Sequence, residues 1–231
     1  MHARAKFLPA LALFALSFGG CAHLEKIEVG NQGPQFTPTN LAGEPFLGGI
    51  RRVVLLPTWG GQVASPESAA ELDGVFLTAL QQQNRFEVVT LSRAECLHRF
   101  RAEALASSGA LPHDLLAVLK REFAADAVMF VDLTTFHAYR PLEVGLRAKL
   151  ATIDGTRLVW TFDTVFSAAD PAVANSARRH FRATLRDAVP ADRTEAVLQS
   201  PSRFAAYAAA TMFGTLPPVT EPVVIAGTAA K

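Results

Sequence analysis

Residues 126–166 restrict the fold of this chain more than any other stretch. The segment 127–136 is almost continuously apolar, which is typical of a strand covered on both faces of a sheet. The segment 144–150 alternates between apolar and other residues, and a third apolar segment follows across Asp154-Gly155, a strong hairpin signal. These segments therefore predict three consecutive strands that are joined by short turns and paired antiparallel.

A β-α-β pattern precedes these strands. Residues 52–57 are a short apolar run closed by a proline, and residues 86–91 are a second apolar run. Between them, Ser65-Pro66-Glu67 combines a capping residue, a proline and an acid in the order that starts helices. Apolar residues at positions 72, 75, 76, 79 and 80 then fall on one helical face. Because a helix connects the two strands, we expect them to be parallel.

Further helix starts complete the expected order of elements. They are Ser92 with Glu95, Pro112 with Asp114, Asp170-Pro171 and Ser200-Pro201. We expect the helix that begins at Ser92 to reach Leu105. The order β-α-β-α-α-β-β-β-α-α predicts an α/β fold, in which helices pack on a mixed sheet of about five strands.

The first 20 residues have the layout of a secretory signal peptide. A basic start is followed by an apolar run from Phe7 to Phe18, and Gly19-Gly20 then precedes Cys21. The apolar run is too short to cross a bilayer core of roughly 30 Å. Ordinary cleavage after Ala22, with secretion, stays open as an alternative, and so does an uncleaved anchor.

Cys21 after two glycines resembles the cleavage box of bacterial lipoproteins, although Phe18 stands where that box usually has an aliphatic residue. In that family the peptidase cuts before the cysteine, which is then acylated with palmitate-type chains. Two or more acyl chains hold a protein stably on a membrane. The resemblance implies an outer-membrane lipoprotein that faces the periplasm, because Ala22 rather than an aspartate follows the cysteine.

The rest of the chain divides into three parts. Residues 21–49 are rich in glycine and proline and show no persistent period, so we expect a lipid anchor and a flexible tether. Residues 50–214 are expected to form a single periplasmic α/β domain. Residues 215–231 have no period either, and we expect a disordered tail.

The domain also carries a family resemblance. A strand that ends in Leu56-Pro57, the entry Ala124-Ala125-Asp126 to another strand, and an Ile-Asp-Gly-Thr hairpin at 153–156 before Trp160 are its motifs. They resemble the periplasmic α/β domain of the curli-secretion lipoprotein, the penicillin-binding-protein activators and the Tol translocation protein N-terminal domain. The similarity covers about residues 50–190. It implies an envelope adaptor or assembly module that binds proteins and has no catalytic residues.

The residues themselves offer no catalytic pattern. None of the six histidines has a partner at metal-binding spacing, and Cys96 lacks a base and is expected to fill apolar space. A formal net charge of +1 gives no electrostatic footprint for nucleic acid. We therefore expect no catalytic residue, no metal, no cofactor and no nucleic-acid partner.

Six residues are candidates for binding an envelope protein partner: Trp59, Tyr139, Arg140, Arg178, Arg182 and Arg186. Exposed tryptophan is enriched at binding hot spots, and the three last arginines are spaced to form one helical stripe. Such a stripe suits a lipid headgroup, a peptidoglycan carboxylate or an acidic protein patch. Packing, a loop edge and a solvated helix face are the ordinary structural explanations.

Two functions from different classes are therefore expected. The first is a non-catalytic, membrane-anchored adaptor or assembly factor in the bacterial cell envelope. The alternative is a periplasmic lipoprotein that binds a small ligand or a glycan, at the loop after the first strand or at the Tyr139-Arg140 turn.

Overall fold

The structure, a computed structural model, describes residues 33–184 and 191–220. The expected signal peptide, Cys21 and Arg186 lie outside the described residues. The strands are β1 (Leu41–Gly43), β2 (Arg52–Leu55), β3 (Glu87–Thr90), β4 (Ala127–His137), β5 (Glu143–Thr152) and β6 (Leu158–Ser167). The helices are α2 (Pro66–Gln81), α3 (Arg93–Phe100), α4 (Leu115–Phe123), α5 (Pro171–Thr184), the 3-10 helix η1 (Ala191–Gln199) and α6 (Pro201–Gly214).

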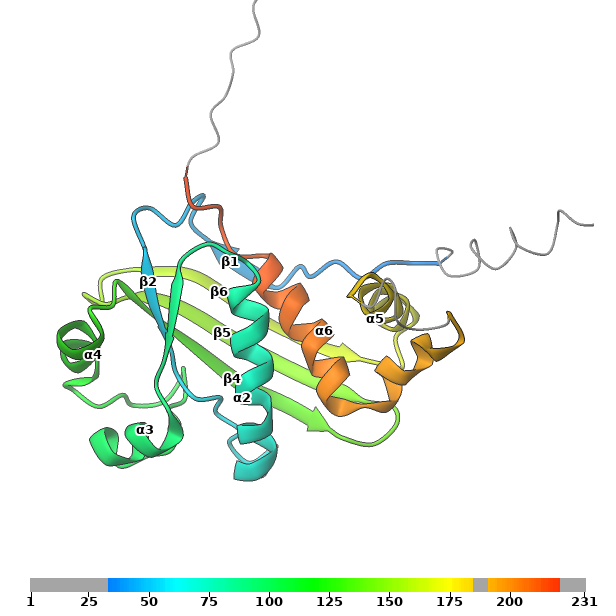
Figure 1. Ribbon diagram of the computed structural model, residues 1–231, viewed down its shortest axis with the longest axis horizontal. Coiled ribbons are helices and arrows are strands. Elements are labelled where there is room, and N and C mark those ends of the chain that lie inside the picture. The colour runs from blue at the N-terminus through cyan, green and yellow to red at the C-terminus, as the bar shows by residue number, and fades with distance from the viewer. Residues whose placement is uncertain (1–32, 185–190, 221–231) are drawn as a thin grey trace, which may run out of the picture.

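The six strands form one mixed sheet in the order β1-β6-β5-β4-β2-β3 (Figure 1). β2 is parallel to β3, as the β-α-β pattern predicts, and it is also parallel to β4. β4, β5 and β6 follow one another as antiparallel neighbours, as their short turns predict. The α/β fold with a mixed sheet is confirmed. The sixth strand, β1, is the addition, and its Leu-Ala-Gly sequence is too short to show alternation.

Helices cover both faces of the sheet around β4. Val53, Met129 and Val131 belong to the larger apolar cluster, which includes buried residues of α2, α5 and α6. Val54 and Val128 belong to a second cluster, which is formed with residues of α3 and α4. Side chains of alternate residues in a strand point to opposite faces, so β4 is buried on both. The prediction from its continuous apolar run, a strand covered on both faces of the sheet, is confirmed.

The described part of the expected tether packs on the domain instead. The Phe36 ring contacts Phe166 edge-on at 5.3 Å, and β1 pairs antiparallel with β6. The side chain of Leu47 is fully buried. The flexible tether expected over 21–49 is therefore wrong from Gly33 onward. Its anchoring residues are single apolar side chains separated by glycine and proline, and such a segment has no period to detect.

The end of the chain also differs from expectation. Ser200 caps α6 and Pro201 lies in its first turn, as predicted. Beyond the helix, Leu216 is buried and the Pro218 carbonyl accepts a 2.8 Å hydrogen bond from the Leu47 N–H. Residues 215–218 thus belong to the domain, and the disordered tail expected from residue 215 is wrong for them.

The helix that begins at Ser92 is shorter than predicted. The capping box is present, because the Glu95 N–H donates to Ser92 Oγ and the Ser92 N–H donates to Glu95 Oε2. The helix nevertheless ends at Phe100, where Arg101 takes a left-handed conformation with φ of 60°. Leu105 is buried beyond this break, so its apolar spacing reflects packing of an irregular segment.

Replacing Leu47 by alanine tests whether the N-terminal segment is part of the folded domain. We expect Leu47→Ala to lower the free energy of unfolding by about 2–5 kcal/mol, because it deletes a fully buried side chain. Leu41→Ala on exposed β1 is the control and should change it by no more than about 0.5 kcal/mol. Urea unfolding measures the free energy of unfolding of both variants. If Leu47→Ala lowered it no more than Leu41→Ala does, packing of the N-terminal segment on the domain would be contradicted.

Candidate functional site

The turn between β4 and β5 protrudes from one end of the sheet. Tyr139 is at its tip and is 87% exposed, and the exposed Arg140 follows it. Both residues are among the candidates that the sequence gives for partner binding. We call residues 138–141 the ridge.

The base of the ridge is fixed by packing and hydrogen bonds. Leu142 is 1% exposed, and its carbonyl accepts a hydrogen bond from the Ala168 N–H at 2.8 Å. Glu143 contacts His137 Nδ1 at 3.0 Å through one carboxylate oxygen and accepts a hydrogen bond from Ser167 Oγ at 2.9 Å through the other. The tip is therefore exposed on a base that cannot rearrange easily.

A bulge in β4 shapes the approach to this ridge. The pairing of β4 with β5 shifts register between Leu133 and Thr135. Gly145 lies opposite, where an added Cβ would come within 2.8 Å of the Thr135 nitrogen. Only glycine fits this close approach, so Gly145 fixes how the end of β4 bends towards the ridge.

Two hollows flank the ridge. The larger, of about 670 Å³, lies between the ridge and the start of α2. The smaller, of about 380 Å³, lies between the ridge and η1, where Glu195 and Leu198 line it. Arg140 and Pro141 line both hollows. The exposed aromatic tip thus lies between two concavities.

Trp59 has a structural place away from the tip. Its backbone extends β2: its N–H donates to the Val131 carbonyl at 3.0 Å, and its carbonyl accepts from the Leu133 N–H at 2.8 Å. Its half-buried ring lies over Gly61, where an added Cβ would be 2.7 Å from ring atom Cζ3. These contacts support the packing explanation for Trp59.

The arginine stripe divides in the structure. Arg178 is half-buried and forms an ion pair with Glu195, with Nε and Oε1 2.7 Å apart, and it also contacts Asn175 Oδ1. Arg182, one turn further along α5, is exposed, and so is Arg179. The outward basic face is thus built on Arg179 and Arg182 rather than on Arg178.

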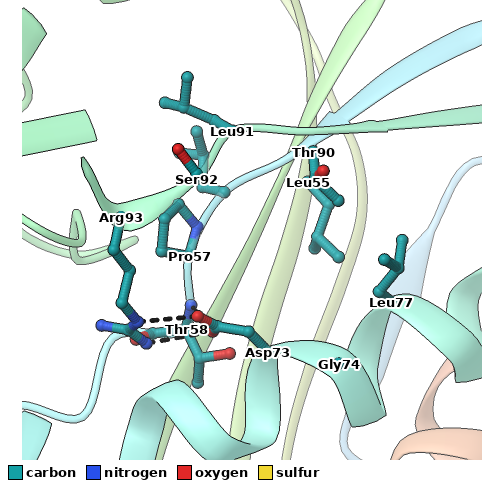
Figure 2. A pocket seen from close by; sticks show the side chains of 11 residues that line it. Leu55, Pro57, Thr58, Asp73, Gly74, Leu77, Thr90, Leu91, Ser92 and Arg93 are labelled. Atoms are coloured by element: carbon teal, nitrogen blue, oxygen red, sulfur yellow. Dashed lines mark hydrogen bonds and ion pairs between the residues drawn. The ribbon is translucent and has the colours of Figure 1, made fainter. Parts of the chain in front are cut away.

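A second feature is the hollow at the carboxyl ends of β2 and β3, which Figure 2 shows. It has a volume of about 270 Å³. Leu55, Leu77 and Leu91 supply apolar lining, and Thr58 and Asp73 supply polar groups. The end of parallel strands is where α/β proteins commonly bind ligands.

The polar groups of this hollow are already paired with each other. Asp73 Oδ1 accepts from the Thr58 N–H at 2.8 Å and from Arg93 Nη2 at 3.0 Å. Asp73 Oδ2 accepts from Arg93 Nε at 2.7 Å, and the Thr58 carbonyl accepts from Arg93 Nη2 (Figure 2). This bidentate pair ties α2 to the start of α3. No sequence pattern predicts this pair, because the two residues are 20 positions apart.

A third polar group is buried over the centre of the sheet. Asp132 on β4 is 1% exposed and accepts hydrogen bonds from the Ser107 N–H and from Ser107 Oγ at 2.7 Å. Lys149 Nζ donates to the Ser107 carbonyl at 2.8 Å. Ser107 therefore holds its loop down on β4 and β5. We call the contacts among Asp132, Ser107 and Lys149 the latch. It was not predicted, although an aspartate inside an apolar strand is a usable signal.

Cys96 and the potential metal ligands are further candidates for a reactive site among the described residues. Burial raises the pKa of the Cys96 thiol to about 11, which leaves it protonated at neutral pH and unreactive. No group of three or more potential metal ligands lies together in the described residues. Among the described helices, none is both long enough and apolar enough to cross a membrane.

Replacing Asp132 by asparagine tests the latch. Burial raises the pKa of this carboxyl, against the opposing effects of Ser107, Arg147 and Lys149. The folded protein therefore holds a proton that the unfolded chain releases, and the carboxyl's contribution to the free energy of unfolding falls as pH rises above about 4. We expect Asp132→Asn to cost about 1–3 kcal/mol at pH 4 and less at pH 7.

Urea unfolding at the two pH values measures this difference. Glu71→Gln, at an exposed position of α2, is the control. It should change the free energy of unfolding by no more than about 0.5 kcal/mol at either pH. A cost of Asp132→Asn that grows from pH 4 to pH 7 would contradict the raised pKa.

Comparison with known proteins finds similarity in structure alone. No protein-family model matches the chain, and no curated protein matches it significantly in sequence. Among solved structures, the chain is similar to the PelC dodecamer from Paraburkholderia phytofirmans, at 10% identity and a TM-score of 0.40, over 72% of this chain and 93% of that chain.

Two further structures are similar to a comparable degree. Lipoprotein GNA1162 from Neisseria meningitidis matches at 11% identity and a TM-score of 0.38, over 60% of this chain and 99% of that chain. The LpoB C-terminal domain from Salmonella enterica matches at 13% identity and a TM-score of 0.31, over 50% and 81%. The expected resemblance to envelope lipoproteins is therefore loose, and nothing about function follows from it.

Proposed function

We propose that this protein is a non-catalytic lipoprotein of the bacterial cell envelope that presents its α/β domain to a protein partner. The observation that carries the proposal is the ridge, whose tip residue Tyr139 is 87% exposed on a fixed base. Burial of an exposed tyrosine against a partner is favourable, and tyrosine is enriched at binding hot spots.

The fixed base makes the ridge suitable for binding. Ordering a flexible loop costs free energy when a complex forms, and a loop that is already ordered avoids much of that cost. Leu142 and the contacts of Glu143 hold the ridge before any partner arrives. The flanking hollows offer places for side chains of the partner, while Arg140 provides a positive charge for orientation.

The proposed place of action is the periplasmic side of the outer membrane. The signal-peptide layout and Cys21 after Gly19-Gly20 support an acyl anchor, and Ala22 supports sorting to the outer membrane.

Binding of a small ligand or glycan is the second candidate. The hollow beside Thr58 and Asp73 favours it by position, at the carboxyl ends of parallel strands. Its volume of about 270 Å³ lies at the small end of ligand pockets, and the Asp73–Arg93 pair already satisfies its main polar groups. These two facts favour the adaptor.

Replacing Cys21 by alanine tests the anchor. We expect Cys21→Ala to abolish labelling by a radioactive or alkyne fatty acid and to remove the protein from the outer-membrane fraction, because the acylated thiol is lost. Cys96→Ala is the control and should keep both properties, since that thiol is buried. A Cys21→Ala protein that is still labelled would contradict the lipoprotein assignment.

Photo-crosslinking from the ridge tests the adaptor. A crosslinking amino acid in place of Tyr139 should give one discrete protein adduct in cells, and the same residue in place of Val165, which is 49% exposed on β6, should not. Once that partner is purified, Tyr139→Ala should weaken its binding about thirtyfold, as for a binding hot spot. Equal adducts at both positions, or an unchanged dissociation constant, would contradict the ridge as the site.

A further inference from the structure

The described chain starts beside α5. Gly33 comes twelve residues after Cys21. The Pro34 carbonyl accepts a hydrogen bond from Asn175 Nδ2 at 3.4 Å, and the Phe36 N–H donates to Ser176 Oγ at 2.9 Å. Figure 1 shows this blue segment running past α5 before it reaches β1. The part of the domain nearest to the proposed lipid anchor is therefore α5.

The connection between them is short. Twelve residues span at most about 40 Å. An electrostatic interaction with a membrane acts within roughly 10 Å of its surface at physiological salt. The connecting length thus allows α5 to reach the headgroups while the acyl chains stay in the membrane.

The charges of α5 are of one sign. The helix contains Arg178, Arg179 and Arg182 and no acidic residue. Arg178 is paired with Glu195, but neither Arg179 nor Arg182 has an ion-pair partner among the described residues. Both are exposed, and Ala183 beside them is also exposed.

The opposite side of α5 packs on the domain. Val173 and Ala177 are buried in the larger apolar cluster. His180 is directed to the ring of Tyr207 at 5.9 Å, and burial lowers its pKa, so it adds no charge at neutral pH. The inner face of the helix thus fixes its position on the domain, while Arg179 and Arg182 are exposed to solvent.

We propose that the outer face of α5, with Arg179 and Arg182, binds the anionic headgroups of the membrane that holds the acyl chains. This inference rests on the proposed lipid anchor. Each arginine near an anionic surface improves binding about fivefold, so the pair shifts the ratio of docked to undocked molecules about thirtyfold. The lipid anchor then keeps the protein at the membrane, and α5 sets the orientation of the domain relative to the membrane surface.

A docked α5 directs the other end of the domain away from the membrane. α4 lies at the opposite end of the long axis from α5 (Figure 1). Ala117 on α4 and Ala183 on α5 are both exposed alanines on helices, and they form a matched pair of probe positions. The buried thiol of Cys96 does not compete for a thiol-reactive dye.

The experiment uses the purified, acylated full-length mature protein in vesicles that contain phosphatidylglycerol and headgroup-nitroxide lipids. A dye is attached in separate samples to Ala183→Cys and to Ala117→Cys. We expect stronger quenching at position 183 than at 117, and we expect the difference to fall in high salt and in vesicles of phosphatidylcholine alone. Flotation of the vesicles measures attachment independently.

Charge removal completes the test. Arg179→Gln with Arg182→Gln should reduce the docked to undocked ratio about thirtyfold without releasing the protein. Lys120→Gln with Arg121→Gln on α4 should change nothing, since these exposed charges are at the far end. Equal quenching at both positions in attached protein overturns the α5 inference alone. Failure of the protein to carry acyl chains and to float with the vesicles overturns the proposed anchor itself.

Discussion

The burial of β4 on both of its faces is the constraint on which the rest of the structure depends. Met129 and Val131 face one helical layer, while Val128 and Phe130 face the other. β4 is also paired along both of its edges, with β2 as a parallel neighbour and with β5 as an antiparallel one. β4 therefore joins the parallel strands β2 and β3 to the antiparallel strands β5 and β6. The end of β4 also determines where the ridge begins.

The same burial explains the polar latch. Asp132 points from β4 into the packed interior, and a charged carboxylate there is costly unless donors satisfy it. Ser107 supplies two donors, and Lys149 holds Ser107 in turn. An irregular loop is thus ordered over the sheet by one side chain of the central strand. The latch thus has a role in packing, because it joins this loop to β4 and β5.

Regular periods made much of the fold predictable. The apolar run of β4, the alternation of β5 and the helix start at Ser65-Pro66 each have a direct physical reading, and each appears in the structure. β1 and the packed segment around Leu47 were missed, because single apolar residues between glycines and prolines anchor them. The length of α3 was wrong because Arg101 adopts a left-handed conformation that a pattern of apolar residues does not report.

The candidate surface was predictable only in part. Tyr139 and Arg140 could be found, because a short polar turn between two strong strands must lie at the end of a sheet. The Asp73–Arg93 pair and the Asp132–Ser107 latch could not be found from spacing, since each pair meets only after the chain has folded. Contacts of this kind depend on the register of the sheet and on loop paths, and a single sequence does not contain either directly.

The arginine stripe shows how much one contact can change the meaning of a pattern. Spacing of four residues groups Arg178 with Arg182, but Arg178 is turned towards Glu195 on η1. Glu195 also lines the hollow beside Arg140, so this ion pair lies next to the ridge. The two surfaces therefore lie at adjacent positions with different chemistry: an aromatic turn suited to a protein, and a basic helix face suited to a lipid surface. A domain that is held on a membrane by α5 can leave the ridge beside the contact and open to a partner.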